Sequence, residues 1–211
     1  MLNLILKDLL IQKKTIALLA LYIIVFSIAF QNIGGGAFTA ITIAITYQMV
    51  AVASSNEEKA NSDIIMNSMP ITRRTIVLSK YLSVFVYALL AVIGYMALFL
   101  ISQLINIPLS IAPINLESLG ASLLGVMLMN GIYYPVYFKL GYVKARIASF
   151  ILFFVFFFGA MQLVDFIREV SPLQQLGNVF SHISNMQVFF ILIGFGLGFT
   201  VLSYVLSLKF Y

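Results

Sequence analysis

Residues 54–81 form the longest polar interval of this largely apolar sequence. Seven of its residues are charged, namely Glu57, Glu58, Lys59, Asp63, Arg73, Arg74 and Lys80. Asp63 is suited to cap a helix by accepting hydrogen bonds from free backbone N–H groups. Ile64, Met66 and Met69 would give that helix an adaptable apolar face, and Pro70 would end it. Such an element fits a groove on a soluble partner, although an ordinary charged loop between two membrane spans has the same composition.

Histidine and cysteine, which often perform catalysis or bind metals, are nearly missing from the sequence. It has one histidine, His182, and no cysteine. A lone loop histidine is either a solvated residue or, less often, a metal ligand. The sequence contains neither a G-x-x-x-x-G-K-[ST] phosphate loop nor a G-x-S-x-G nucleophile motif. These features argue against an enzyme and predict no catalytic residue, metal or cofactor on this chain.

Three threonines form the clearest polar pattern inside an apolar segment. Thr39, Thr42 and Thr46 recur at i, i+3 and i+7, so they share one helix face. That face is suited to line a translocation path. The same spacing also fits threonines that bond to backbone carbonyls one turn back or that pack between helices.

The elements that carry these residues are predicted to be transmembrane helices. Hydrophobic residues make up 62% of the 211 and charged residues 9%, far from the composition of soluble domains. Segments long and apolar enough to span a bilayer are 15–33, 37–54, 82–106, 118–138, 147–165 and 187–208. We therefore expect an all-α polytopic membrane protein with one transmembrane domain over 1–211. Pro135 predicts a kink or exit, and Gly194 and Gly198 predict close approach to another helix.

The N-terminal residues predict a further short helix. Leu2, Ile5, Leu6, Leu9 and Leu10 share one helix face, and Asn3, Lys7 and Gln12 fall on others. This pattern indicates an amphipathic helix at the inner membrane surface, or simply an extension of the first span.

The distribution of basic residues predicts the orientation in the membrane. With both termini in the cytoplasm, 11 of the 12 lysines and arginines lie on the cytoplasmic side and only Arg168 lies outside. This bias strongly favours cytoplasmic termini. Residues 55–81 then form a cytoplasmic loop and 166–186 an outer loop, which is either a gate made of short helices or a plain exposed segment.

Two loop motifs resemble a known transporter family. Asp63–Pro70 followed by Arg73 and by Lys80–Tyr81 is similar to the loop between spans two and three of small bacterial ABC-2-type permeases. Pro135, Lys139, Gly141, Lys144 and Arg146 resemble the family's Pro-x-x-x-Lys-x-Gly-x-x-Lys-Ala-Arg motif. Met69 departs from the leucine usual at its position. The similar proteins include permeases that export phenol-soluble modulins and antimicrobial peptides.

The resemblance implies a fold and a set of partners. It implies a type-2 ABC exporter-like permease in the bacterial cell membrane, paired with a second permease copy in a homo- or heterodimer. A separate cytosolic ATPase would hold the ATP and magnesium and dock on the coupling helix through Asp63, Ile64, Met66, Met69, Pro70 and Arg73. Lys144 and Arg73 would anchor at the inner surface.

The resemblance favours an amphipathic peptide as substrate, and the apolar spans suit lipids or apolar drugs equally. A membrane immunity or regulatory protein that binds a partner without transport is the alternative function, and an intramembrane enzyme is a third. Nucleic acid is not expected as a partner, because the basic residues lie in short loops between spans.

Overall fold

The computed structural model describes residues 2–30, 36–60, 62, 68, 70, 72–105, 113–169 and 185–211. The predictions on Asp63, Ile64, Met66, Met69, His182 and most of the outer loop lie outside this part. The regular elements in it are helices, which confirms the all-helical architecture. They are α1 (Leu2–Ile11), α2 (Lys13–Ala17), α3 (Leu19–Phe30), α4 (Ala37–Lys59), α6 (Arg73–Ile105), α7 (Leu116–Leu140), α8 (Tyr142–Glu169) and α10 (Asn185–Phe210).

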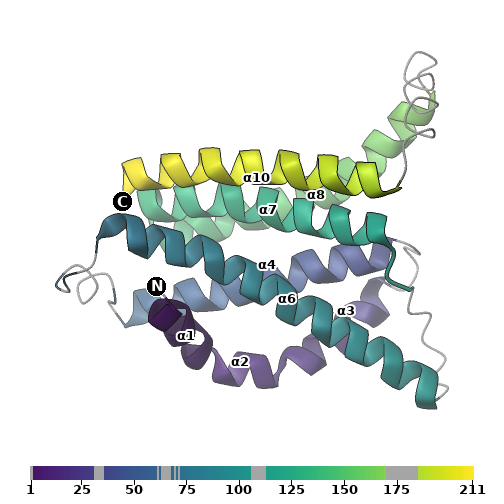
Figure 1. Cartoon of the computed structure of the whole chain (residues 1–211), viewed down its shortest axis with the longest axis horizontal. Helices are drawn as coiled ribbons and strands as arrows, with labels where there is room; N and C mark the ends of the chain where they lie inside the picture. Colours follow the sequence, from purple (N-terminus) through teal and green to yellow (C-terminus); the bar gives the residue numbers. More distant parts are fainter. Residues whose placement is uncertain are drawn as a thin grey trace.

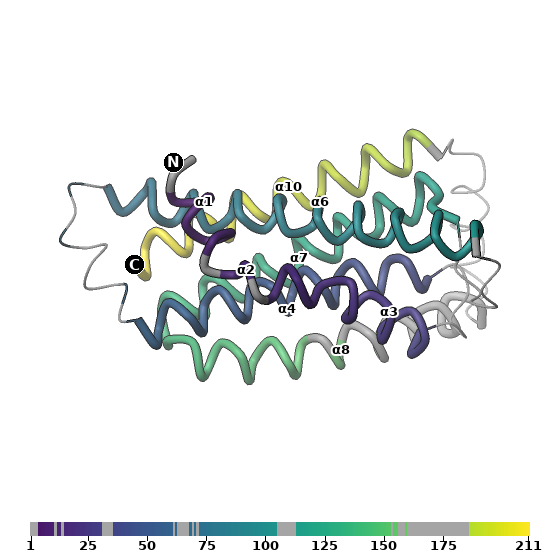
Figure 2. Tube along the Cα trace, turned by 90° about the horizontal axis from the view of Figure 1, so that it is seen from below, coloured from purple at the N-terminus to yellow at the C-terminus, as the bar shows by residue number. Residues whose placement is uncertain are grey.

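The long helices lie side by side in an elongated bundle (Figures 1 and 2). α10 packs along α7, and α4 lies between α7 and α6. α3 covers α4 and α6, α8 packs on α7 and α4, and α1 packs across α6. Large apolar side chains such as Leu89, Phe195 and Val205 point outward, as a lipid-facing surface requires.

Four helices of the described part are long and apolar enough to cross a membrane, namely α4, α6, α7 and α10. The first predicted span, 15–33, is not one continuous helix, because a turn at Leu18 separates α2 from α3. α3 has only 12 residues. Neither α3 nor α8 is among the four helices, so passage of the first and fifth predicted spans through a bilayer stays a prediction. The interval between α4 and α6 is also shorter than the predicted loop 55–81, since both helices extend into it.

Local sequence signals explain where these helices begin and end. Thr72 precedes α6, and its hydroxyl accepts a hydrogen bond from the backbone N–H of Thr75 at 3.4 Å. Asn115 and Ser118 form a reciprocal capping box at the start of α7. Gly141 ends α7 at φ +80°, a conformation that favours glycine, and its N–H bonds to the carbonyl of Tyr137 at 2.9 Å.

Glycines allow α7 and α10 to pack closely. A Cβ atom at Gly131 would lie 2.7 Å from the ring of Phe199, and one at Gly196 would lie 2.5 Å from the sulfur of Met127. The predicted pair Gly194 and Gly198 has open space instead. Gly196 therefore makes the close approach within this chain, and contact of the predicted pair with a second copy stays a prediction.

Pro135 neither ends α7 nor forces an exit, because the helix continues to Leu140. Proline lacks the N–H that would bond to the carbonyl four residues earlier, which belongs to Gly131. Ser203 of α10 donates its hydroxyl hydrogen to that carbonyl instead. Tyr81 of α6 shares hydrogen bonds with Ser203 and Ser207. A polar network thus joins α6, α7 and α10 at the point where Pro135 interrupts the backbone hydrogen bonds of α7.

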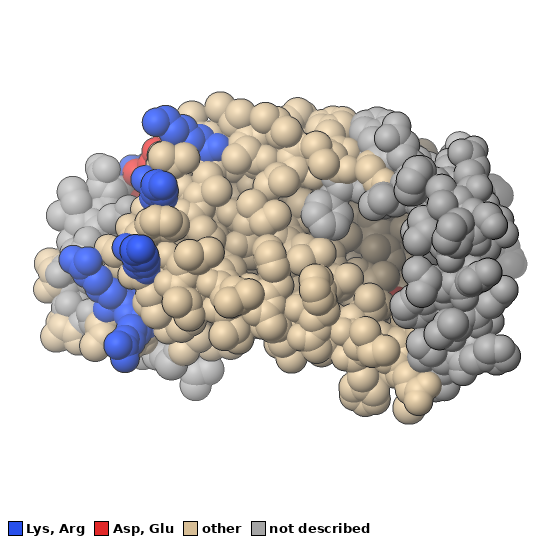
Figure 3. Space-filling model, turned by 90° about the horizontal axis from the view of Figure 1, so that it is seen from above, with Lys and Arg blue, Asp and Glu red and all other residues tan. Residues whose placement is uncertain are grey.

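Basic side chains gather at one end of the bundle (Figure 3). We call this the basic end; it holds α1, the last residue of α4, the first turn of α6, the α7–α8 turn and the end of α10 (Figure 1). Beside it, α7 carries Tyr133, Tyr134 and Tyr137. They are buried in the core, where the ring of Tyr133 stacks on Tyr137 and meets Tyr134 edge to face.

Candidate functional site

Four charged residues from three helices meet at the basic end. Lys80 of α6 donates a hydrogen bond to Asp8 of α1 at 2.9 Å and another to Glu57 of α4. Lys7 of α1 lies 3.0 Å from Glu57 and 3.4 Å from the other oxygen of Asp8. We call Lys7, Asp8, Glu57 and Lys80 the ion quartet. It contains two positive and two negative groups, so the cluster is neutral as a whole.

The ion quartet is buried, and its internal pairing makes that burial possible. Asp8, Glu57 and Lys80 are 3%, 4% and 6% exposed. Burying a charge is very costly unless it is paired and hydrogen-bonded, and here each charge has an opposite partner. Burial lowers the pKa of Lys7, but the charge and hydrogen bond of Glu57, helped by Asp8, outweigh it and raise that pKa. The cluster therefore favours the charged form of Lys7.

The quartet explains how α1 sits on the bundle. The hydroxyl of Ser83 donates to Asp8 at 3.3 Å, and one turn further along α1 the amide of Gln12 donates to the hydroxyl of Tyr87 at 2.8 Å. Gln12 is fully buried. The helix turns its polar side inward to α6 and leaves Leu6 and Leu10 exposed.

The quartet also lies at the base of the predicted docking loop. Glu57 comes two residues before the end of α4, and the hydroxyl of Ser62 donates to its backbone carbonyl at 3.2 Å. Lys80 lies two turns into α6, on the other stem of the loop. The two stems are therefore held together and to α1 by charge-assisted hydrogen bonds.

Of the predicted docking residues, the structure describes Pro70 and Arg73, and both are exposed. Arg73 donates a hydrogen bond to the carbonyl of Tyr211 at 3.0 Å and lies 6.0 Å from the centre of that ring. The first turn of α6 is thereby joined to the end of α10. Whether these residues dock a partner stays a prediction.

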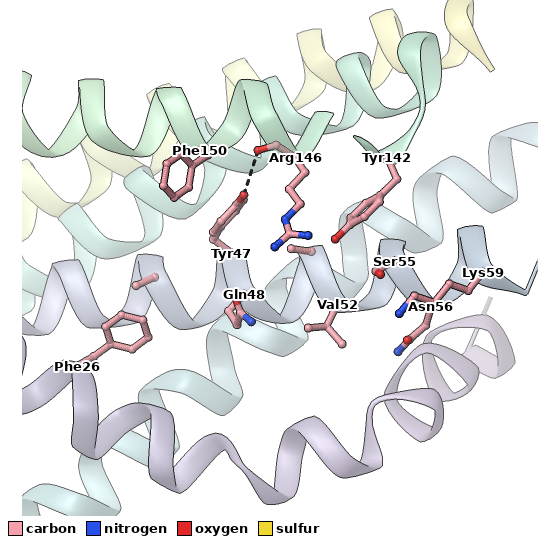
Figure 4. A pocket seen from close by; sticks show the side chains of 12 residues that line it. Phe26, Tyr47, Gln48, Val52, Ser55, Asn56, Lys59, Tyr142, Arg146 and Phe150 are labelled. Atoms are coloured by element: carbon pink, nitrogen blue, oxygen red, sulfur yellow. Dashed lines mark hydrogen bonds between the residues drawn. The ribbon is translucent and has the colours of Figure 1, made fainter. Parts of the chain in front are cut away.

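The second predicted loop surrounds the turn between α7 and α8. Lys139 lies 5.0 Å above the ring of Phe210, and Gly141 makes the turn. Lys144 and Arg146 are exposed on the first turns of α8. Arg146 extends from α8 toward α4, beside Tyr142 (Figure 4).

The side chain of Arg146 points into a pocket of about 500 Å³ between α3, α4 and α8. Tyr47 lies on its wall and donates a hydrogen bond to the carbonyl of Arg146 at 3.5 Å (Figure 4). The complete described lining is Phe26, Ala44, Tyr47, Gln48, Ala51, Val52, Ser55, Asn56, Lys59, Tyr142, Arg146 and Phe150.

The predicted path-lining threonines do not border this pocket. Thr42 and Thr46 are fully buried, and Thr46 donates to the carbonyl of Thr42 at 2.7 Å. Thr39 donates to the carbonyl of Ser118 on α7 at 3.3 Å. In this conformation Thr46 bonds to the backbone one turn back, and Thr39 bonds across to α7. A role in lining a path stays a prediction.

The part of the chain that the structure describes contains no group of three histidine, cysteine, aspartate or glutamate side chains placed to bind a metal. The ion quartet was not predicted, because its members belong to three helices, α1, α4 and α6, that are far apart along the chain. A signal was nevertheless present. Asp8 and Gln12 share one face of α1, and Lys80, Ser83 and Tyr87 share one face of α6.

Comparison with known proteins identifies one family. A family model described as "ABC-2 family transporter protein" matches residues 3–211. No curated protein and no solved structure gives a match.

Proposed function

We propose that this chain, which belongs to the ABC-2 family of transporter proteins, is the membrane-spanning permease subunit of an ATP-driven ABC exporter. Its substrate is an amphipathic or hydrophobic molecule, with a peptide favoured. The energy comes from a separate cytosolic ATPase that binds ATP and magnesium. The observation that carries this proposal is the family match over nearly the whole chain.

The loop between α4 and α6 is the proposed site of ATPase docking. A partner can drive a conformational change only if it contacts the loop differently in its two nucleotide states. On this proposal Asp63 caps the coupling helix, and Ile64, Met66 and Met69 fill a groove of the ATPase. The ion quartet supports it, because a push on the loop would reach α4, α6 and α1 together.

The basic end is proposed to face the cytoplasm of a bacterial cell. The gathering of lysine and arginine there supports this orientation through the positive-inside rule (Figure 3). Both termini would then be cytoplasmic. A second permease copy completes the transporter, and the open faces of Gly194 and Gly198 on α10 are available to it.

The proposal is tested by co-expressing the chain with candidate ABC ATPase subunits from the same genome. We would compare the wild type with Met66→Asp/Met69→Asp, which places charges on the proposed apolar contact. The control is Ala60→Asp, which adds charge to an exposed position at the end of α4. Co-purification and peptide-stimulated ATP hydrolysis in proteoliposomes are the two measurements.

We expect the double variant to lose co-purification and stimulated hydrolysis, while Ala60→Asp keeps both. Unchanged assembly of the double variant would refute docking through 63–70. If the wild-type chain associates with no ATPase, the transport function itself is wrong, and a membrane protein that binds a partner without transport replaces it.

A further inference from the structure

The pocket between α3, α4 and α8 has a polar end and an apolar end. Lys59, Asn56 and Tyr142 lie toward the basic end, and Phe26 and Phe150 lie toward the middle of the bundle (Figure 4). The lining residues recur at helical spacing on both long walls, so one face of α4 is opposed to one face of α8. This gradient suits a ligand with one charged and one apolar part.

The charge of the pocket favours a ligand of negative charge. Lys59 and Arg146 are its two charged residues, and the described lining includes no aspartate or glutamate. Neither cation takes part in an ion pair within the part of the chain that the structure describes. Arginine binds phosphate oxygens through paired N–H groups, and neighbouring hydroxyl and amide groups supply further donors.

The size of the pocket favours a lipid over a helical peptide as its ligand. About 500 Å³ is typical of a small-molecule site. A helical peptide, about 10–12 Å wide with its side chains, would fill that volume with about one turn. A lipid headgroup with the first part of an acyl chain fits better, and its charge would sit at the membrane surface.

We propose that this pocket binds an anionic phospholipid of the membrane leaflet at the basic end. The phosphate lies between Arg146 and Lys59, and the acyl chain runs over Phe26 and Phe150 toward the middle of the bundle. Basic pockets between transmembrane helices are known to hold anionic headgroups. The bound lipid joins α8 to the end of α4, directly beside the proposed docking loop. The site requires that the helices span a bilayer, and it does not depend on which substrate is transported.

The test is native mass spectrometry of the full-length chain in detergent, titrated with phosphatidylglycerol or phosphatidylcholine. We expect phosphatidylglycerol to bind the wild type about tenfold more tightly, because only its headgroup carries a net negative charge. Lys59→Gln/Arg146→Gln should remove this preference. The matched control is Lys139→Gln/Lys144→Gln, which removes the same charge from exposed positions outside the pocket and should keep the preference.

A second pair of variants tests the acyl end. Phe150→Ser should weaken phosphatidylglycerol binding about fivefold, whereas Val155→Ser, exposed on the same helix outside the pocket, should not. Equal loss in the two charge variants would overturn the assignment and leave a general attraction to basic residues. Displacement of the lipid by inorganic phosphate at equal concentration would overturn it in favour of a phosphate site. Binding of an amphipathic peptide in place of the lipid would assign the pocket to transport and refute our proposal.

Discussion

Replacing Lys80 by methionine is the sharpest test of the ion quartet. Methionine has a similar length and keeps the packing of the side chain, but it removes the charge that pairs with Asp8 and Glu57. Both carboxylates stay buried, and only Lys7 is left to compensate them. The variant therefore isolates the electrostatic contribution of Lys80.

The expected loss is about 3 kcal/mol of unfolding free energy. Removing one partner of a buried ion pair typically costs about 3–5 kcal/mol, because the other charge is left uncompensated. We place the loss at the low end of that range, since Lys7 lies within 3.4 Å of both carboxylates. Adding Asp8→Asn to the variant removes one of the uncompensated charges. The double variant should therefore regain at least about 1 kcal/mol over Lys80→Met alone.

Denaturant unfolding in detergent micelles measures both effects, and hydrogen exchange of α1 gives an independent readout. The backbone amides of α1 should exchange faster in Lys80→Met, because this helix is fastened to α6 through Asp8. The control is Arg74→Met, which removes an exposed charge from the first turn of the same helix. A loss within about 0.5 kcal/mol of this control would refute the reasoning. So would strict additivity of Lys80→Met and Asp8→Asn.

Three further predictions follow from the packing and the charges. Gly131→Ala should destabilise the chain by about 1–3 kcal/mol, because the new Cβ would meet an aromatic ring of α10, whereas Gly194→Ala should be nearly neutral in the same unfolding assay. Ser203→Ala should cost about 1–3 kcal/mol by leaving a buried carbonyl without a donor. It should cost less in a Pro135→Ala background, which restores the missing N–H; an equal cost in both backgrounds would contradict this account. The pKa of Lys7 is raised in the folded state, so protonated Lys7 contributes to stability. This contribution is fully present below the unfolded pKa of 10.5 and is lost as the pH rises through the folded pKa. Stability measured above pH 10.5 should therefore fall more steeply in wild type than in Lys7→Gln, and parallel curves would contradict it.

The helices themselves were largely predictable from the sequence. Apolar length and the lack of charge identified α4, α6, α7 and α10, because a bilayer-spanning helix needs about 20 apolar residues. The first predicted span was less accurate, since its apolar composition hides the turn at Leu18. Hydropathy measures transfer into lipid, and it does not report where a helix axis changes direction.

The charged residues show the limit of this reasoning most clearly. Lys80 was counted among the cytoplasmic basic residues, and Glu57 was placed in the charged loop. Both are in fact buried, and Lys80 pairs with Glu57 and with Asp8, a residue for which the sequence suggested no role. The faces of α1, α4 and α6 that carry them could be identified from helical periodicity. Which face meets which could not, because that depends on how the three helices cross.

The sequence alone indicated that this is a membrane protein made of helices, which end carries the positive charge, and which family it resembles. These follow from composition and local order, since each helix satisfies its backbone hydrogen bonds within itself. Only the tertiary structure decided which polar residues meet. It joined α1, α4 and α6 in the ion quartet across 23–72 residues of chain, supplied Ser203 to the carbonyl freed by Pro135, and opened a basic pocket between α4 and α8. Such contacts depend on the relative placement of whole helices, which no local pattern encodes.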